Sequence, residues 1–122
     1  MLKRFLFLLS LILVTPVWAG EYEDANRFDA HVFLYLQTPE CGYCRQFDPI
    51  YAKLEKKYHN ECKFVKIDAN TDYGYSVMQK IGAHYVPYVL LINNQRQTIQ
   101  RVLPQCLLNN ACIKDAVEKF VK

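Results

Sequence analysis

The segment PECGYCRQFDPIY, residues 39–51, holds two cysteines three positions apart at the start of a helix-like run. Side chains at positions i and i+3 share one face of a helix. Cys41 and Cys44 are therefore close enough to form a disulfide once the first turn adjusts. The preceding Pro39 stops any upstream helix, which predicts that Cys41 lies at the helix start and Cys44 inside its first turn.

A sulfur at the start of a helix has a distinctive electrostatic environment. The first backbone N–H groups have no partner within the helix, and the helix dipole is positive at that end. Such a position lowers a cysteine pKa from about 8.5 towards roughly 3.5–7.5. We therefore predict that Cys41 is the attacking sulfur and that the more buried Cys44 resolves the mixed disulfide. Glu40 opposes ionisation of Cys41, and Arg45 is a candidate to offset that effect.

A zinc site and a purely structural disulfide both explain the CxxC pair less well than a redox centre does. A CxxC pair is half of a zinc site, which needs two further ligands. The remaining candidate ligands form no second CxxC and no HxxxH pair: Cys62, Cys106, Cys112, His31, His59 and His84. A structural disulfide is disfavoured because closing so short a loop removes little entropy from the unfolded chain. The pattern favours a redox centre, with no metal and no organic cofactor.

The beginning of the chain, residues 1–19, has the composition of a secretory signal peptide. A short basic head precedes an apolar run over residues 5–14, and Ala19 provides the small residue that signal peptidases prefer. The alternative is an uncleaved membrane anchor, but the run is interrupted by Pro16 and is shorter than the ~20 residues that span a bilayer core. We expect cleavage after Ala19, which leaves residues 20–122 as one domain.

Charge and cysteine content narrow the class of protein further. The chain has a formal net charge of +3, which falls to +1 when Lys3 and Arg4 leave with the signal. No stripe of basic residues alternates with aromatic ones, so nucleic-acid binding is not indicated. All five cysteines follow the signal, and export to an oxidising compartment permits disulfides. Because five is odd, at least one thiol stays unpaired within the monomer, or pairs are exchanged.

Hydrophobic periodicity places helices and strands in alternation along the chain. We expect helices at residues 21–28, 41–59, 72–81 and from 109 or 110 onward, and strands at residues 31–36, 62–68, 88–92 and 98–102. This order contains one parallel crossover and a closing antiparallel hairpin. It predicts an α/β fold in which helices cover both faces of a sheet.

These elements and motifs together resemble the thioredoxin family over nearly all of residues 20–122. Pro49 lies five residues beyond Cys44, where thioredoxins have a proline that kinks the active-site helix. The segment KIDAN, residues 66–70, is similar to the end of the family's central strand. The segment IGAHYVPYVLLI, residues 81–92, is similar to the run that passes through its cis-proline. The resemblance implies the thioredoxin fold, with a central mixed sheet and helices on both faces.

The resemblance also implies roles for individual residues. Cys41 corresponds to the nucleophile and Cys44 to the resolving thiol, so the two form the redox-active disulfide. Pro87 corresponds to the cis-proline, and we expect the Val86–Pro87 bond to be cis and to face the sulfurs. Backbone beside a cis-proline is open for pairing with an extended substrate peptide. The residues expected to bind unfolded substrate form an apolar rim: Tyr43, Tyr85, Val86 and Pro87.

Several positions depart from the thioredoxin pattern. Gly42-Tyr43 between the cysteines is similar to the exported bacterial disulfide isomerases, whereas cytoplasmic thioredoxins have Gly-Pro. Tyr35 replaces the buried aspartate that helps to relay a proton to the resolving cysteine, and Leu103 replaces a glycine that lines the substrate groove. Exported isomerases carry a separate dimerisation domain, for which roughly 100 residues leave no room, so we do not expect a self-sufficient V-shaped isomerase. The protein is expected to be a monomer.

The three remaining cysteines and one histidine each have two possible roles. Cys106 and Cys112 enclose five residues between the hairpin and the last helix, and either form a structural disulfide or are small buried residues. Cys62 is expected to be a half-buried thiol, with pairing to one of those two or to another chain as the alternative. His84 is either a surface residue or a group that approaches and tunes Cys41.

These features predict an exported, periplasmic thiol:disulfide oxidoreductase, closer to oxidases and isomerases than to reductases. Its partners would be cysteine-containing exported proteins and a redox protein that resets the cysteine pair. The expected redox potential is roughly −130 to −220 mV, a more oxidising couple than that of thioredoxin. Two alternatives stay open. One is a non-enzymatic binding or assembly module of the envelope whose disulfide is permanently closed, and the other is a metal carrier.

Overall fold

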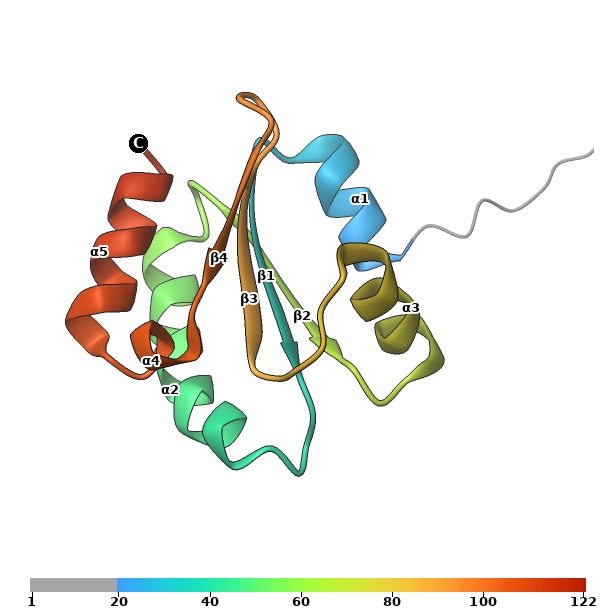
Figure 1. The fold of residues 1–122 in the computed structure, drawn as a ribbon. Coiled ribbons are helices and arrows are strands. Elements are labelled where there is room, and N and C mark those ends of the chain that lie inside the picture. The colour runs from blue at the N-terminus through green and yellow to red at the C-terminus, as the bar shows by residue number, and fades with distance from the viewer. Residues whose placement is uncertain (1–19) are drawn as a thin grey trace, which may run out of the picture.

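Residues 20–122, which the computed structural model describes, form a sheet between two layers of helices (Figure 1). The helices are α1 (Glu21–Phe28), α2 (Gly42–Tyr58), α3 (Asp72–Ile81), α4 (Pro104–Leu107) and α5 (Asn110–Phe120). Helices α1 and α3 cover one face of the sheet, while α2, α4 and α5 cover the other. The predicted signal peptide lies outside the described residues.

The sheet has four strands in the order β2-β1-β3-β4. The strands are β1 (His31–Gln37), β2 (Lys63–Asp68), β3 (Tyr88–Asn93) and β4 (Thr98–Val102). Strands β1 and β2 are parallel and are connected through α2, whereas β3 is antiparallel to both β1 and β4. The predicted parallel crossover, closing hairpin and mixed sheet are therefore confirmed.

Strand β1 is apolar on both faces because the helix layers form two separate cores. Phe33 and Tyr35 point into the core under α2 and α5, and Val32, Leu34 and Leu36 into the core under α1 and α3. All five side chains are fully buried. Burying one such side chain contributes roughly 1.5–3 kcal/mol, so this central strand anchors both layers. Its carboxyl end leads directly to the paired cysteines.

The ends of α3 are set by local hydrogen bonds and by one glycine. The Thr71 hydroxyl accepts a 2.9 Å hydrogen bond from the Gly74 N–H and caps the first turn. Gly82 has a φ of 73°, in the left-handed region that glycine enters without a steric penalty, and it ends the helix where the sequence predicts. Gly74 is needed for another reason. A Cβ atom there would overlap the Asp68 carbonyl oxygen, so α3 lies directly against the loop after β2.

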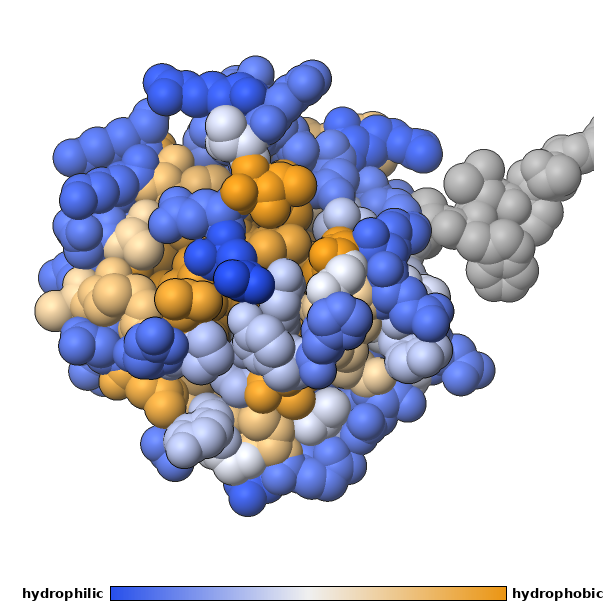
Figure 2. Space-filling view, viewed as in Figure 1, coloured by the Kyte–Doolittle hydropathy of each residue, from blue (hydrophilic) through white to orange (hydrophobic). Residues whose placement is uncertain are grey.

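The short helix α4 is an element that the sequence analysis did not predict. Leu103 precedes it, Pro104 occupies its first turn, and Leu107 is fully buried. A four-residue helix is too short for its pattern to stand out from a turn, and its position depends on packing. Figure 2, in the same view as Figure 1, shows hydrophobic residues reaching the surface in the middle of this face and hydrophilic ones around its rim.

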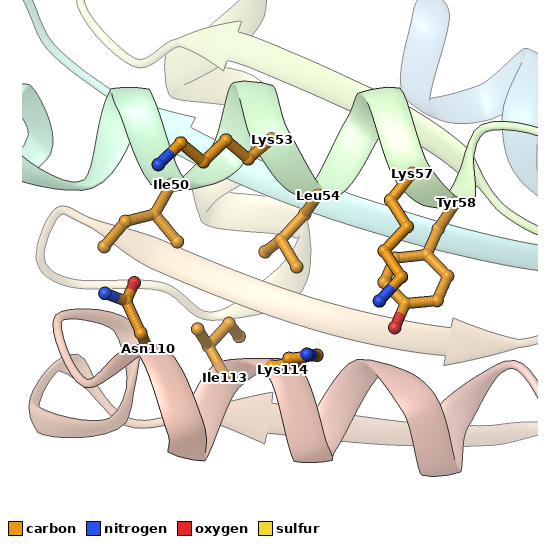
Figure 3. A pocket seen from close by; sticks show the side chains of 8 residues that line it. All are labelled: Ile50, Lys53, Leu54, Lys57, Tyr58, Asn110, Ile113 and Lys114. Carbon is orange, nitrogen blue, oxygen red and sulfur yellow. The ribbon is translucent and has the colours of Figure 1, made fainter.

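A shallow groove of about 250 Å³ lies between α2 and α5. Figure 3 shows Ile50, Leu54 and Ile113 in its middle, with lysine side chains from both helices around them. None of the residues predicted for the functional site lines it. Among residues 20–122, no helix is long and apolar enough to cross a membrane.

Candidate functional site

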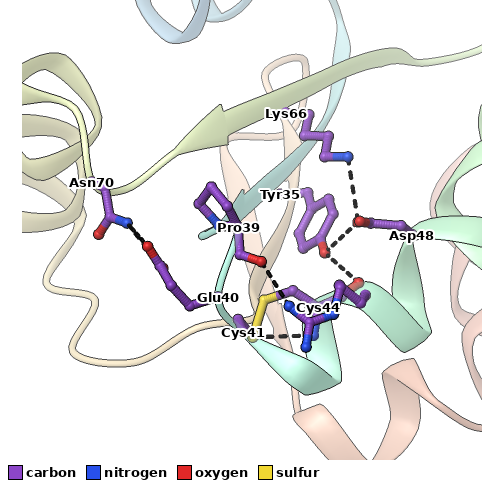
Figure 4. The surroundings of a disulfide bond; sticks show 9 residues. Tyr35, Pro39, Glu40, Cys41, Cys44, Asp48, Lys66 and Asn70 are labelled. Carbon is purple, nitrogen blue, oxygen red and sulfur yellow. Dashed lines mark hydrogen bonds and ion pairs between the residues drawn. A yellow bond between two sulfur atoms is a disulfide. The ribbon is translucent and has the colours of Figure 1, made fainter.

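Cys41 and Cys44 are joined by a disulfide at the first turn of α2, with their Cα atoms 5.1 Å apart (Figure 4). Cys41 is the N-cap residue, and its Sγ accepts a 3.0 Å hydrogen bond from the Cys44 backbone N–H. A sulfur thus occupies the place that a serine or aspartate oxygen takes in an ordinary N-cap. Negative charge on this sulfur would be stabilised by that N–H and by the helix dipole.

The two sulfurs differ in access to solvent. Cys44 is completely buried in the core under α2, whereas Cys41 is partly exposed and packs at the edge of that core. An incoming sulfur therefore reaches Cys41 first. This asymmetry follows from the helix itself, since position 41 precedes α2 and position 44 faces inward with Phe47 and Tyr51.

The charged residues beside Cys41 in the sequence, Glu40 and Arg45, each form hydrogen bonds with other residues. Both carboxylate oxygens of Glu40 accept hydrogen bonds from the Asn70 side chain, at 3.0 and 2.9 Å. The backbone N–H of Glu40 and the Asn70 amide lower the pKa of this exposed carboxyl. Arg45 donates a 2.8 Å hydrogen bond to the Pro39 carbonyl oxygen. Glu40 is thus bound to the loop after β2, and the expectation that Arg45 offsets the effect of Glu40 on Cys41 stays a prediction.

Tyr35 lies beneath the redox pair and, through Asp48, is connected to Lys66 on strand β2. Its hydroxyl is 2.8 Å from Asp48 Oδ1 and 3.1 Å from the Cys44 carbonyl oxygen. Asp48 in turn forms an ion pair with Lys66, with 3.3 Å between Oδ1 and Nζ. Burial, and then the hydrogen bond to Asp48, raises the pKa of Tyr35, so the phenol stays protonated and donates. Strands β1 and β2 are thereby tied to the first turns of α2 (Figure 4).

Sequence reasoning missed Asp48 and Lys66 as members of the site. Asp48 lies one helical turn after Cys44, so the two side chains point to the same side of α2. Lys66 is two residues after Phe64 in β2 and therefore faces α2 as well. A signal was available, because a tyrosine in a buried strand position requires a partner for its hydroxyl.

The predicted substrate rim is divided by the structure into two parts. The Val86–Pro87 bond is cis, and Pro87 is buried beside a pocket that Tyr43 also lines. Tyr43 is 63% exposed, so its ring is free to contact another molecule. Tyr85 packs on Tyr88 instead, with 5.1 Å between the ring centroids, and neither Tyr85 nor Val86 lines the pocket.

His84 does not join the candidate site. Its side chain is exposed, and it lines a surface hollow with Tyr75, Met78 and Gln79 of α3. Among the described residues, no three His, Cys, Asp or Glu side chains gather in an arrangement that would hold a metal ion.

The other three cysteines have distinct environments. Cys106 and Cys112 form a second disulfide, with 5.3 Å between their Cα atoms, which connects α4 to α5. Cys112 is exposed and Cys106 partly so. Cys62 is a free thiol in the described chain and is only 4% exposed, so the expectation of a half-buried residue was wrong. Burial raises the pKa of Cys62 to about 12, which keeps it protonated and unreactive at neutral pH.

Known proteins with similar sequences include thioredoxins. The family model described as thioredoxin matches residues 16–112. A thioredoxin from Borreliella burgdorferi is 40% identical over 75 residues, which is 62% of this chain and 62% of that protein. The chain therefore aligns with less than two thirds of this relative's length. The protein belongs to the thioredoxin family.

Solved structures show the same fold at low sequence identity. The oxidised thioredoxin from Plasmodium falciparum superposes with a TM-score of 0.68 at 22% identity, covering 84% of this chain and 91% of that one. The thioredoxin from Malassezia sympodialis gives a TM-score of 0.70 at 15% identity, covering 91% and 98%. The predicted thioredoxin fold is thus confirmed.

Proposed function

We propose that this protein is an exported thiol:disulfide oxidoreductase that exchanges disulfides with cysteine-containing proteins of the bacterial envelope. One observation carries the proposal: the Cys41 sulfur caps α2 and accepts the Cys44 N–H, while Cys44 is buried behind it. A capping sulfur is stabilised as a thiolate, and the thiolate is the form that attacks disulfides and leaves from them.

The exchange proceeds through a mixed disulfide in either direction. In the reducing direction, the Cys41 thiolate attacks one sulfur of a substrate disulfide, and the other substrate sulfur leaves as a thiolate and takes a proton. Cys44 then loses its proton and attacks Cys41 Sγ, which forms the protein disulfide and releases the first substrate sulfur as a thiol. Two electrons pass from the protein to the substrate. One of the two protons that the substrate thiols gain comes from Cys44, and the other comes from solvent, which received it when Cys41 ionised. In the oxidising direction, a substrate thiolate attacks Cys41 Sγ and the same steps run backwards.

The preferred direction is proposed to be oxidation or isomerisation. A thiolate stabilised at Cys41 favours the reduced protein, and a couple whose reduced form is stabilised is a stronger oxidant. Tyr43 between the cysteines, and Tyr35 in place of a buried acid, support the same direction through the family resemblance. We expect a redox potential of roughly −130 to −220 mV. Equilibration of the protein with glutathione buffers measures it, and a value more reducing than about −260 mV would overturn this direction.

Export to the periplasm is proposed from the composition of residues 1–19. Cleavage after Ala19 would leave the amino group of Gly20 as the new terminus, and this nitrogen lies 3.1 Å from Glu23 Oε1. The mass of the protein recovered from the periplasmic fraction tests this directly. A chain that begins at Gly20 supports export and cleavage, whereas an intact chain in the membrane fraction supports an anchor.

The redox partners are proposed to be exported proteins with cysteines, together with a protein that resets the Cys41–Cys44 pair. Replacement of Cys44 by alanine removes the resolving thiol, so mixed disulfides at Cys41 should accumulate in cells. Capture should disappear in the matched Cys41→Ala, Cys44→Ala variant. Equal capture by both variants would mean that the trapped proteins are bound elsewhere.

The second candidate function is a binding or assembly module whose disulfides only stabilise the fold. The observation that favours this candidate is the second, partly exposed disulfide between Cys106 and Cys112. It lies outside the CxxC motif, so at least one disulfide of this chain has a structural role. Mild dithiothreitol followed by alkylation and mass spectrometry separates the two functions. An oxidoreductase opens Cys41–Cys44 first and is alkylated at Cys41. A structural module resists, or opens Cys106–Cys112 first.

A further inference from the structure

The groove between α2 and α5 combines an apolar floor with a basic rim (Figure 3). Leu54 and Ile113 in its floor are buried. The rim consists of exposed lysines from both helices, Lys53 and Lys57 on α2 and Lys114 on α5. No acidic side chain lines the groove, and none of these lysines forms an ion pair within the described part of the chain. Both walls therefore have a positive charge that no lining residue balances.

A buried hydroxyl at one end of the groove also lacks a partner. Tyr58 lines this end and is only 6% exposed, and its hydroxyl forms no hydrogen bond with any residue that the structure describes. Burial, and then the negative charge of Glu118, raises the pKa of this phenol, so it stays protonated and able to donate. Lys57 Nζ lies 5.3 Å from the centre of the Tyr58 ring. Because an unpaired buried hydroxyl costs free energy, an acceptor from a bound molecule would stabilise a complex here.

The shape of the groove favours a helix as its occupant. Ile50, Leu54 and Tyr58 are four residues apart on α2, so they form a row about 12 Å long on one helix face. Ile113 of α5 lies opposite this row (Figure 3). A third helix whose apolar side chains have the same spacing can pack between the two. The volume of about 250 Å³ is below the range of about 300–1,000 Å³ for sites of whole small molecules, which favours side chains of a protein segment.

The charge of the rim restricts the occupant further. Glutamate or aspartate side chains on both flanks of an apolar helix face would reach the lysines on both walls and reduce the repulsion between them. A second copy of this chain that used the same groove would instead place lysine against lysine. Each exposed ion pair contributes little by itself, so binding depends on the apolar floor and on both walls together.

We propose that the groove between α2 and α5 is a docking site for an acidic amphipathic helix of a partner protein. The apolar side chains of that helix lie on the floor, its carboxylates pair with the three lysines, and one oxygen accepts the Tyr58 hydroxyl after Lys57 has turned towards the ligand. Ile50 is the lining residue nearest to Cys44 in the sequence, and neither redox cysteine lines the groove. The docking site is thus separate from the redox centre, and the inference does not depend on the proposed exchange function.

The test uses three short synthetic peptides, blocked at both ends, and the protein with both disulfides formed. The first peptide has leucines at positions i, i+4 and i+8, glutamates beside them and alanine elsewhere. The second has lysine in place of glutamate, and the third has serine in place of leucine. Glutamate and lysine have similar helix propensities, so a difference between the first two peptides reports charge. Fluorescence anisotropy at low ionic strength gives the affinity, and chemical shifts of the ¹⁵N-labelled protein locate the contact.

We expect the glutamate peptide to bind roughly tenfold more tightly than either of the other two, with shift changes on the facing sides of α2 and α5. The double variant Lys53→Gln, Lys114→Gln should weaken its binding roughly fivefold. The matched variant Lys56→Gln, Lys63→Gln removes the same charge outside the groove and should change the affinity by about twofold or less. Tyr58→Phe should weaken binding about threefold without lowering the stability of the protein, because the hydroxyl that it removes is unpaired.

Each other result contradicts a specific part of the proposal. Equal affinity for the glutamate and lysine peptides, or no binding of either, would overturn the docking site. Shift changes around Cys41 and Pro87 instead of the groove would overturn its location. Unchanged binding in Tyr58→Phe would overturn the role of the hydroxyl.

Two further measurements separate this occupant from others. Binding to vesicles of phosphatidylglycerol that is lost in Lys53→Gln, Lys114→Gln, together with no binding of the glutamate peptide, would assign the groove to a membrane surface and overturn the proposal. Sedimentation of the unmodified protein should show a monomer. Self-association that the same double variant abolishes would make a second copy of the chain the occupant, which also overturns the proposal.

Discussion

The Tyr35 hydroxyl donates a 2.8 Å hydrogen bond to Asp48 Oδ1, which joins the central strand of the sheet to the helix that carries the redox cysteines. The thioredoxin resemblance places a buried aspartate at position 35. In this protein the carboxylate is on α2 instead, one turn beyond Cys44, and Lys66 of β2 balances its charge. The buried group nearest the Cys44 backbone is therefore a neutral phenol, held in place by a paired carboxylate.

Replacement of Tyr35 by phenylalanine should destabilise the protein. The ring would still fill the core, but Asp48 would lose a donor and the Cys44 carbonyl oxygen would lose a polar neighbour. A hydrogen bond to a charged group contributes roughly 1.5–3 kcal/mol, and the partial exposure of Asp48 reduces this to about 1–2 kcal/mol in the free energy of unfolding. Urea denaturation measures it. Tyr75→Phe is the control, since its hydroxyl contacts only Gln79 at the surface; equal losses in both variants would rule out this role for Tyr35.

Substitution of Gly74 by alanine should also lower stability. The added methyl group would overlap the Asp68 carbonyl oxygen, so α3 or the loop after β2 must shift. We expect a cost of roughly 1–3 kcal/mol in thermal or urea unfolding. Gly42→Ala is the matched variant, because nothing lies within 4 Å of a Cβ atom there and alanine favours a helix. Its stability should be unchanged or slightly higher, and a similar loss in both would contradict the packing described for α3.

Acid should weaken the attachment of α1 to α3. Partial burial of Glu23 by itself would raise its pKa, but hydrogen bonds from Lys80, Tyr73 and the backbone outweigh burial and lower that pKa from 4.5 to about 2. The ionised carboxylate therefore favours the folded state above pH 4.5, and this contribution is lost as the pH falls towards 2. Since the Lys80 side chain is 54% exposed, we expect about 1–2 kcal/mol.

Glu23→Gln checks this pH dependence against an exposed ion pair. In that variant, the free energy of unfolding should change less between pH 4.5 and 2 than in the unmodified protein. Asp115→Asn removes the surface pair with Lys119, whose side chains are 59% and 74% exposed, and should leave the pH profile unaltered. A profile that is the same in Glu23→Gln as in the unmodified protein would show that other carboxyls control acid stability.

The buried thiol of Cys62 should not be alkylated in the native protein. With a pKa of about 12 and 4% exposure, Cys62 should not react with iodoacetamide at pH 8, even after the Cys41–Cys44 disulfide has been reduced. It should react fully once the chain is unfolded in guanidinium chloride. Mass spectrometry of the Cys62 peptide gives both results, and labelling of the native protein at the rate seen for Cys41 would show that this core opens readily.

Much of the fold could be predicted because its strands and helices are strongly patterned. Strand β1 is a continuous apolar run, α3 ends at a glycine with positive φ, and α1 and β4 have the predicted bounds. The antiparallel pairing of β3 and β4 follows from their short connection, and the parallel crossover follows from the helix between β1 and β2. Helix α4 could not be predicted in this way, because four residues give no periodicity and its position depends on Leu107 and on a disulfide.

The candidate site was predictable where its chemistry depends on local spacing. The positions of Cys41 and Cys44 follow from the CxxC motif and the helix start, and the cis bond at Pro87 followed from the family resemblance. The contacts between Tyr35, Asp48 and Lys66 depend on how α2 packs across β1 and β2. Local sequence patterns do not predict this packing. The partner of Glu40 was also missed, because Asn70 is thirty residues away in the sequence.

The most direct test of the proposed redox centre is the pH dependence of Cys41 alkylation in the protein reduced with mild dithiothreitol. A sulfur that caps α2 and accepts the Cys44 N–H should be alkylated as a thiolate, with a midpoint in the range of roughly 3.5–7.5. Cys44 should remain unmodified over the same range. A midpoint at or above about 8.5, or alkylation of Cys44 before Cys41, would contradict the claim that Cys41 is the activated sulfur of a redox centre.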